Sequence, residues 1–523
     1  MVGVPGRSKG CSTCRKRKKG CDKTRPVCTN CSNAGLQCGG YERERVFLNH
    51  TQGTKSKAVH VVYRKGYQHT SFGGATDIAP DIAPDIALAH SLAQTASIEG
   101  YVSIFLTKYF PGGRTMIPGR LGSSRNWIEI AHGLYTSDEA TRFALLSLGL
   151  FAVGESQHAT QSYCFALHKL QRALDNPRQA RNDSTLAACQ LLSLLEVSLL
   201  AHAANPGHFS VIASQLPALT IMAHRQIFHG AEENVLSQEC KWRSHVSGLL
   251  ALIRTRSPQA YQSGVSHQLF ANGRYALLIA SITHRQRFPL NSPEWKTIPW
   301  EKQSKSSMDK LYDIMADLCE ILADTDEMRY CDDAAKKSNL RDDVKRDCYC
   351  LDSGLQNWLM EAGPLVDFYN NDGIPVCPAD SADLLLAHMT LLYWTLRIVL
   401  YATLISIHDP PLSEVPADIS PLPYIRSVAN ALPYFWSPGA GMYGANLAAS
   451  PWGLCLHMIY AMSDRYQDEA ALLERFAAQQ SGANTVLRFL NSLQRSSAGP
   501  EMASLDGKEG MILRAQKWMM GNH

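Results

Sequence analysis

Six of the 15 cysteines in the chain lie close together near its N-terminus. They are Cys11, Cys14, Cys21, Cys28, Cys31 and Cys38, and the last three repeat the spacing of the first three. Cysteine pairs at this spacing are typical zinc ligands, and a tetrahedral zinc takes four ligands. Six thiolates therefore fit two zinc ions only if two of them bridge. The repeat indicates Cys11 and Cys28 as the bridging pair. Cys14 and Cys21 would then complete one site, and Cys31 and Cys38 the other.

A disulfide framework is the alternative use of paired cysteines. Disulfides belong to oxidising compartments, and a protein sent there begins with an apolar signal segment. Residues 1–9 are instead mostly Gly, Pro, Val and basic types, and the number of cysteines in the chain is odd. We therefore expect a reduced intracellular protein that binds zinc.

The two repeats differ in charge. The first contains five consecutive cations, and the matching stretch of the second, residues 32–37, contains none. The cations are Arg15, Lys16, Arg17, Lys18 and Lys19. Residues 1–50 hold 11 Lys and Arg against 3 Asp and Glu, a net charge of +8, whereas the whole chain carries +4. Cations could balance the negative charge of a zinc–thiolate cluster. Both repeats surround the same cluster, however, so this balance does not explain their difference. A basic surface on one repeat is typical of binding to a phosphate backbone.

Residues 10–41 resemble the fungal binuclear zinc-cluster domain of transcription factors. The resemblance rests on the six cysteines, the basic run, Asp22 after the third cysteine and Pro26 between the repeats. It implies that the short helix after the second cysteine enters the major groove of double-stranded DNA, typically at CGG-type triplets. Gly20 departs from the family pattern, which usually has a basic or bulky residue before the third cysteine.

The resemblance also implies a role for each cation. Arg17 and Lys18 would contact base edges, with Lys18 favoured, because Lys and Arg commonly reach the acceptors of guanine. The other three cations, Arg15, Lys16 and Lys19, would contact phosphates. The same run would serve as a nuclear import signal.

Residues 42–94 are predicted to be a flexible linker between residues 8–41 and a second domain. No leucine heptad occurs between residues 42 and 75, and glycines interrupt any long helix there, so a coiled coil is not expected in this segment. The sequence therefore leaves a monomer and a homodimer both open. Residues 77–87 repeat Asp-Ile-Ala-Pro. We interpret this repeat as part of the linker, with an activation segment as the alternative.

Residues 95–523 are predicted to form a large mainly α-helical domain. Apolar residues recur there with helical periodicity, Pro and Gly clusters separate the segments, and strand-like alternation is scarce. The predicted helical segments are 140–153, 161–175, 184–203, 239–254, 266–284, 307–323, 341–361, 382–407, 451–466 and 468–494.

Parts of this domain resemble the fungal-specific transcription factor domain. The carriers of the resemblance include Tyr163–Leu167, Ser184–Glu196, His245–Pro258, His267–Phe270, Arg274, Phe288, Pro293–Trp295 and Pro299–Trp300. The resemblance implies a regulatory and interaction role, and it transfers no catalytic residue.

Three other features allow two interpretations each. Residues 384–407 are long enough to span a bilayer, but they contain His388 and Arg397, so we predict a buried helix and no membrane. Residues 439–444 match a dinucleotide-binding fingerprint by letter, but no strand is expected before them, so we predict a loop. The acidic residues between 324 and 343 alternate with cations and are predicted to form a solvated loop between helices, with an activator surface as the alternative.

Together these features predict a sequence-specific DNA-binding regulator of RNA polymerase II transcription in the nucleus, with two zinc ions per chain. Its partners would be double-stranded DNA and the transcription machinery, and its targets metabolic or secondary-metabolite genes, as in many relatives. The chain contains no serine elbow, Walker loop or zinc-protease helix, so no enzyme is expected. The alternative is a zinc cluster that binds protein or serves a structural role on a helical scaffold or uncharacterised enzyme.

Overall fold

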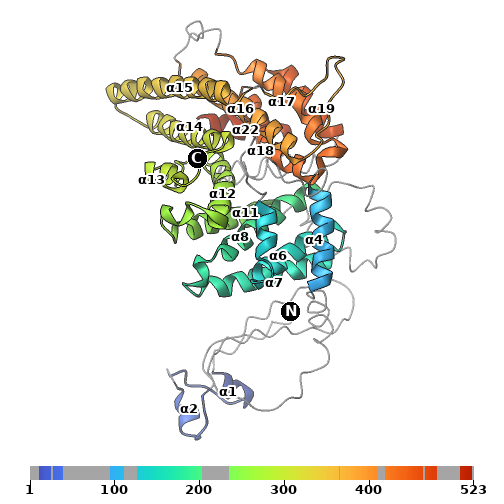
Figure 1. Ribbon diagram of the computed structural model, residues 1–523. Coiled ribbons are helices and arrows are strands. Elements are labelled where there is room, and N and C mark those ends of the chain that lie inside the picture. The colour runs from blue at the N-terminus through green and yellow to red at the C-terminus, as the bar shows by residue number, and fades with distance from the viewer. Residues whose placement is uncertain are drawn as a thin grey trace, which may run out of the picture. The chain divides into compact units, whose positions relative to one another are not determined.

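The structure is a computed structural model that describes residues 11–24, 27–38, 95–110, 127–202, 235–363, 365–408, 419–462, 466–479 and 507–520. It divides into two units, Met1–Ala79 and Pro80–His523, which are described separately (Figure 1). All regular elements in these residues are helices, apart from one isolated bridge between Tyr369 and Pro375. The predicted fold class, a two-helix cysteine module and a large mainly helical domain, is confirmed. The predicted linker, residues 42–94, lies outside the described residues.

The N-terminal unit contains two short helices, α1 (Ser12–Lys16) and α2 (Thr29–Ser32). Each helix follows the first cysteine of one repeat, so the two cysteines of each pair lie one helical turn apart. Helices this short are unstable on their own in water. The buried residues of the described part of this unit are four cysteines, so its core consists of sulfur rather than of apolar side chains.

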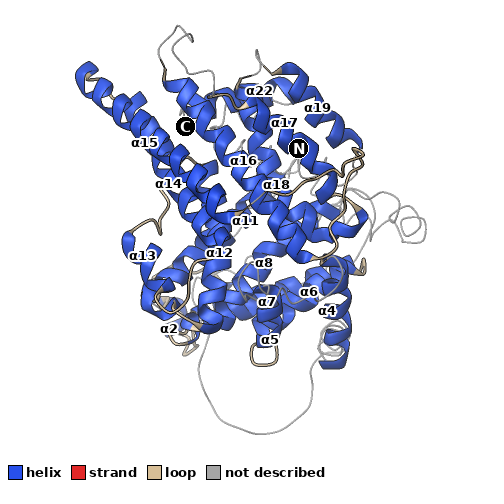
Figure 2. Cartoon of the chain, turned by 45° about the horizontal axis from the view of Figure 1, so that its top comes forward, coloured by secondary structure: helices blue, strands red, loops and turns tan. Residues whose placement is uncertain are grey.

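The second unit packs its helices around one continuous hydrophobic core. In chain order the α-helices are α4 (Thr95–Tyr109), α5 (Trp127–Leu134), α6 (Glu139–Ala152), α7 (Ser156–Leu174), α8 (Asp183–His202), α11 (Val235–Arg254), α12 (Gly264–Thr283), α13 (Pro293–Thr297), α14 (Ser307–Arg329), α15 (Ala334–Ala362), α16 (Ser381–Ile407), α17 (Leu422–Phe435), α18 (Gly441–Ala461), α19 (Gln467–Gln479) and α22 (Gly507–Met520). Short 3₁₀ turns occur at Gln179–Arg181, Pro258–Tyr261, Ile298–Trp300 and Pro438–Ala440. Figure 2 shows α14 and α15 packed side by side, with α15 extending beyond the body of the unit.

Helix α16 is the predicted buried helix. It has the length and hydropathy of a membrane span, but 83% of its most apolar window is buried inside the unit. Asp380 is its N-cap, and the Asp380 side chain accepts hydrogen bonds from the N–H groups of Ala382 and Asp383 at 2.8 and 3.0 Å. The buried Arg397 pairs with Asp352 of α15 and donates to the Tyr401 hydroxyl at 2.6 Å. The predicted burial of this helix is confirmed.

The C-terminal helices close the core on α16 and its neighbours. Helix α18 packs along α16, and its Trp452 is fully buried. Helix α22 places Trp518 over the guanidinium of Arg285, 4.7 Å from the ring centroid, and Trp518 donates to the Thr283 carbonyl oxygen at 2.8 Å. Arg329 of α14 donates to the carbonyl oxygen of Met519. These contacts join the end of the described chain to α12 and α14.

The prediction of a solvated loop between residues 324 and 343 is wrong except at residues 330–333, which connect α14 to α15. Helix α14 continues to Arg329 and α15 begins at Ala334, so most of the acidic residues lie on helices. Asp326 accepts two short hydrogen bonds from Arg285, at 2.6 and 2.8 Å. Arg287 binds a row of three carboxylates on α14, those of Glu320, Asp324 and Glu327. The cations that balance this acidic stretch come from a much earlier part of the chain, which local sequence does not reveal.

The loop predicted at residues 439–444 is also partly wrong. Residues 441–444 form the first turn of α18, and a short 3₁₀ turn precedes them. Gly441 has a φ of +61°, and a Cβ there would lie 2.6 Å from the carbonyl oxygen of Tyr109. Glycine is therefore required for the close approach of α18 to α4, which explains a glycine here without any nucleotide.

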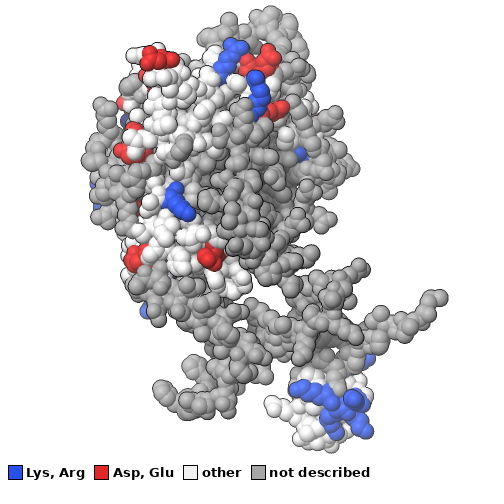
Figure 3. Space-filling model, turned by 90° about the vertical axis from the view of Figure 1, so that its right-hand side faces the viewer, with Lys and Arg blue, Asp and Glu red and all other residues white. Residues whose placement is uncertain are grey.

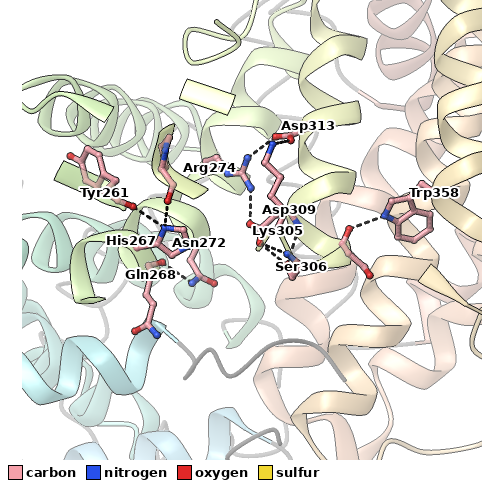
Figure 4. A network of polar contacts seen from close by, with 12 residues as sticks. Tyr261, His267, Gln268, Asn272, Arg274, Lys305, Ser306, Asp309, Asp313 and Trp358 are labelled. Carbon is pink, nitrogen blue, oxygen red and sulfur yellow. Dashed lines mark hydrogen bonds and ion pairs between the residues drawn. The ribbon is translucent and has the colours of Figure 1, made fainter. Parts of the chain in front are cut away.

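A buried ion-pair network joins α12 to the start of α14 (Figure 4). Arg274 donates to Asp313 at 2.9 Å and to Asp309 at 2.7 Å, and its guanidinium lies 4.3 Å from the centre of the Trp300 ring. Asp309 also completes a capping box with Ser306 at the N-terminus of α14. One carboxylate therefore begins a helix and binds the neighbouring helix at the same time.

We predict that Arg274→Ala lowers the free energy of unfolding by about 3–5 kcal/mol, because it leaves the largely buried carboxylate of Asp309 without its cation, while Asp313 keeps Lys305. Chemical denaturation of the purified chain measures this change. Arg346→Ala is the control, since Arg346 forms an exposed pair with Asp343 and its loss should cost less than about 1 kcal/mol. Equal losses for the two variants would show that the network does not stabilise the fold.

We predict opposite effects for two glycines inside helices. A Cβ at Gly149 of α6 would lie 2.7 Å from the carbonyl carbon of Tyr101 in α4, so Gly149→Ala should cost about 1–3 kcal/mol. A Cβ at Gly354 of α15 would meet nothing within 4 Å, so Gly354→Ala should stabilise the helix by about 0.5–1 kcal/mol. Thermal unfolding of both variants tests the packing of α4 on α6. A gain in stability for Gly149→Ala would contradict it.

Candidate metal centre and nucleic-acid interface

The structure gathers the six cysteines of the N-terminal unit into two groups of four sulfurs. One group holds Cys11, Cys14, Cys21 and Cys28, and the other holds Cys11, Cys28, Cys31 and Cys38. Within each group all Sγ atoms lie within 4.8 Å of one another. The two groups share Cys11 and Cys28, the pair that the sequence repeat indicates as bridging.

The distances between the sulfurs fit a zinc site. The Sγ atom of Cys11 lies 3.6 Å from that of Cys28 and 3.7 Å from that of Cys31, and Cys14 lies 3.7 Å from Cys28. A tetrahedral zinc with Zn–S bonds of about 2.3 Å separates its sulfur ligands by about 3.8 Å. Cys14 also lies 3.8 Å from Cys31, although the predicted assignment places these two sulfurs on different ions. The cysteines can bind two zinc ions, which would supply the folding energy that this unit lacks in apolar burial.

The two repeats hold the shared sulfurs in the same way. The N–H of Cys14 donates to the sulfur of Cys11 at 3.3 Å, and the N–H of Cys31 donates to the sulfur of Cys28 at 3.3 Å. Each shared cysteine therefore caps the helix that follows it. A hydrogen bond from a backbone N–H favours the thiolate, the form that binds metal.

The two repeats also bind each other through a reciprocal pair of hydrogen bonds. The hydroxyl of Thr13 donates to the carbonyl oxygen of Gln37 at 3.0 Å. The side-chain amide of Asn30 donates to the carbonyl oxygen of Gly20 at 2.9 Å. Thr13 and Asn30 occupy equivalent positions in the two repeats, and so do Gly20 and Gln37. The two repeats are therefore related by approximate twofold symmetry in the structure.

Asp22 has a role that sequence reasoning missed. Its carboxylate accepts hydrogen bonds from the N–H of Thr29 at 3.0 Å and from the hydroxyl of Thr24 at 2.5 Å. These bonds from Thr24 and Thr29 hold the pKa of Asp22 well below its usual range. The carboxylate thus pins the first turn of α2 to the first repeat. The only sequence signal was the position of Asp22 directly after the third cysteine.

Burial favours the protonated form of two of these cysteines, Cys14 and Cys28. It raises the pKa of Cys14 to about 12 and that of Cys28 well above its usual value. Zinc must displace these protons when it binds, so zinc affinity should fall as the pH falls.

The cations of the first repeat form an exposed surface. Lys16, Arg17, Lys18 and Lys19 are all exposed, and Arg15 lies in α1 with its side chain outside the described residues. Figure 3 shows Lys and Arg side chains gathered on this unit with no acidic side chain among them on that face. The matching residues 32–37 are also exposed but carry no charge. The structure therefore brings the predicted cations together on one repeat only.

The departure at Gly20 leaves an open position next to these cations. A Cβ at Gly20 would meet nothing within 4 Å. The glycine is therefore not required by packing, and its carbonyl group keeps its hydrogen bond to Asn30 whatever side chain it carries.

Residues 100–432 match the family described as the fungal specific transcription factor domain, which is more than half of the chain. The chain belongs to this family. Residues 9–45 match the fungal Zn(2)-Cys(6) binuclear cluster domain. Both resemblances expected from the sequence are thus confirmed. These families are transcription factor domains and not enzymes, so the chain is a fungal-type transcription factor.

Among curated proteins, the chain is 60% identical over 30 residues to sterol uptake control protein 2 of Candida albicans. The match covers 6% of this chain and 4% of that protein, so the chain spans only a small part of its relative. No solved structure matches the chain.

Four of the residues that carry the resemblance to the fungal transcription factor domain, His267, Phe270, Arg274 and Trp300, lie together at the Arg274 network. His267 is hydrogen-bonded to the carbonyl oxygens of Tyr261 and Pro299 at 2.8 and 3.0 Å, and its ring contacts Trp300 edge-on. His267 therefore has a structural role, because its contacts join α12 to the segment that leads to α14.

We predict that replacing a shared cysteine lowers the zinc content of the chain more than replacing an unshared cysteine does. Cys11→Ser or Cys28→Ser removes a ligand from both groups and should abolish stable zinc binding. Cys21→Ser or Cys38→Ser removes a ligand from one group only and should leave about one ion per chain. Elemental analysis of the dialysed full chain measures the content.

The control for this experiment is Cys350→Ser. Cys350 is exposed and lies on α15 in the second unit, so its loss should leave the zinc content at the wild-type value. Equal zinc losses in Cys11→Ser and Cys21→Ser would rule out the bridging arrangement.

Proposed function

We propose that this transcription factor is a sequence-specific DNA-binding regulator of RNA polymerase II transcription that acts in the nucleus. The observation that carries the proposal is the charge difference between two halves of one cluster that share their backbone geometry. Thr13 and Asn30 make equivalent bonds, and both repeats cap a helix with a shared cysteine. Only one repeat carries cations. A cluster that served folding alone, or bound a protein partner, would not need all of its charge on one half.

Each residue of the metal centre and interface has a proposed role. Cys11 and Cys28 bridge two zinc ions, with Cys14 and Cys21 completing one site and Cys31 and Cys38 the other. The side chains proposed to contact base edges in the major groove are those of Arg17 and Lys18. The side chains proposed to contact phosphates are those of Arg15, Lys16 and Lys19. The exposure of Lys16–Lys19 supports these roles, because long cations on a surface can reach both base edges and phosphates.

The target sequence is proposed to contain a CGG-type triplet, and the targets to be metabolic or secondary-metabolite genes. The similarity to sterol uptake control protein 2 covers only a segment of 30 residues. A match over so short a segment gives no support for a shared pathway. The helical unit is proposed to contact the transcription machinery, and the basic run Arg15–Lys19 to act also as the import signal.

The full chain should bind a CGG-containing duplex in the presence of zinc and release it when a chelator removes the metal. Electrophoretic mobility shift against an excess of unrelated duplex measures this binding. Binding that survives complete zinc removal, or that shows no difference between the two duplexes, would contradict the proposal.

Two single substitutions should separate base contacts from phosphate contacts. Lys18→Ala should reduce the preference for the CGG duplex by about 1–3 kcal/mol, whereas Lys19→Ala should weaken binding to all duplexes and reduce the slope of the salt dependence by about 1. Titrations at several salt concentrations measure both effects. An unchanged preference in Lys18→Ala would show that another residue contacts the base edges.

A further inference from the structure

The connection between α11 and α12 presents a serine directly before a proline. Ser257 is followed by Pro258, and its backbone is extended, with a φ of −76° and a ψ of 161°. Residues before a proline favour this conformation. Ser257 is exposed, and its hydroxyl does not cap the 3₁₀ turn that Pro258 begins. The chain therefore offers an accessible serine hydroxyl in an extended Ser-Pro segment.

The fold holds this segment in place. Tyr261, at the end of the 3₁₀ turn, is fully buried, and its hydroxyl donates to the carbonyl oxygen of Ile253 in α11 at 3.0 Å. The carbonyl oxygen of Tyr261 accepts a hydrogen bond from His267 of α12 at 2.8 Å. Ser257 therefore lies beside a turn that both neighbouring helices support.

Ser257 differs from the other serines that precede a proline. The sequence contains five Ser-Pro pairs and no Thr-Pro pair. Ser292 is exposed too, but its hydroxyl donates to the carboxylate of Glu294 at 2.7 Å. The remaining three are half-buried, and they are Ser420, Ser437 and Ser450. Among the five serines, Ser257 is therefore the one that combines exposure with a hydroxyl that makes no hydrogen bond to the described residues.

Two arginines precede Ser257 in the chain. Arg254 is exposed and donates to the carbonyl oxygen of Pro289 at 2.8 Å. Arg256 donates to Asp183, at the start of α8, at 2.6 Å, and its Nε has no hydrogen-bond partner among the described residues. A phosphate group placed beside arginines gains charge-assisted hydrogen bonds. The surroundings of Ser257 therefore favour a phosphorylated side chain.

We propose that Ser257 is phosphorylated by a proline-directed protein kinase and that its phosphate binds the two arginines before it. In this reaction the Oγ atom of Ser257 attacks the γ-phosphorus of ATP. The bond from that phosphorus to the oxygen that bridges the β- and γ-phosphates breaks, ADP leaves, and the hydroxyl proton passes to a base of the kinase. The site belongs to the helical unit and does not depend on the proposed DNA binding.

Phosphorylation changes the contacts at the start of α8. A phosphoserine carries a charge of about −1.5 to −2 at pH 7. It competes with Asp183 for the guanidinium of Arg256, whereas Asp183 keeps its hydrogen bond from the hydroxyl of Ser266 at 2.7 Å. The modification therefore weakens the ion pair between α8 and the connection after α11 without leaving Asp183 unpaired.

Phosphorylation of the folded full chain tests the site. The chain is incubated with magnesium and ATP and, in separate reactions, with a cyclin-dependent and a mitogen-activated protein kinase, and mass spectrometry locates the phosphate. We expect at least one of these kinases to phosphorylate Ser257. Ser257→Ala should lose this phosphate, Ser257→Thr should keep it because the hydroxyl remains, and the control Ser292→Ala should match the wild type. A wild-type chain that neither kinase phosphorylates at Ser257 would overturn the proposal, as would phosphate on the other Ser-Pro pairs in its place.

A second measurement tests the contact with the arginines. Phosphorus NMR follows the pKa of the phosphate, which is about 6 in a phosphoserine without partners. This pKa should be lower in the folded chain than in the same chain unfolded in urea, by at least about 0.5, because neighbouring guanidinium groups favour the dianion. Arg254→Gln should raise the folded value towards the unfolded one. Equal pKa values in the folded and unfolded chains would show that the arginines do not bind the phosphate.

Discussion

Two shared sulfurs hold the N-terminal unit together. The described part of that unit buries four cysteines and no apolar side chain of any other type, and its helices span five and four residues. Such a segment has too little hydrophobic burial to fold alone, so metal–thiolate bonds have to replace the core. The sulfurs of Cys11 and Cys28 lie in both groups of ligands and each caps a helix. The position of every cation on the surface therefore depends on them.

The large unit, in contrast, has a continuous apolar core. Ion pairs between its helices help to determine how the helices align. The carboxylates of α14 bind Arg274 of α12 and four cations of the segment between α12 and α14, which are Arg285, Arg287, Lys296 and Lys305. Arg274 and Arg285 are buried, and a buried charge without its partner is costly, so these two cations favour the observed alignment of α12 and α14. The charges specify the arrangement, while the apolar core supplies most of the stability.

The metal centre was predictable because its ligands are close together in the chain and their type and spacing carry the chemistry. Helix α16 was predictable because its apolar run is long and contains His388 and Arg397, which favour a buried helix over a membrane span. Helices α4, α5, α17 and α22 lie outside the predicted segments. The apolar residues of α4 and α22 are weakly segregated, and their burial depends on distant partners. Helices α5 and α17 have clear apolar faces, so their periodicity could have revealed them. The acidic stretch around Asp326 was misassigned because its partners are also distant in the chain. The backbone of Lys18 is left-handed, with a φ of +53°, like that of the aligned Gly35, with a φ of +62°. The residue type of Lys18 does not indicate this conformation, so the sequence alone did not predict it.

The closure of the core by α18 and α22 has a consequence for the genetics of this protein. The segment that matches the fungal transcription factor domain ends at residue 432, before either helix begins. Even so, Trp452 is fully buried and Trp518 covers Arg285. A nonsense mutation between the matched segment and α18 would remove both helices, so the shortened chain would not keep this fold. It would leave the apolar surface of α16 bare, and the allele would behave as a loss of function although every recognisable domain is encoded.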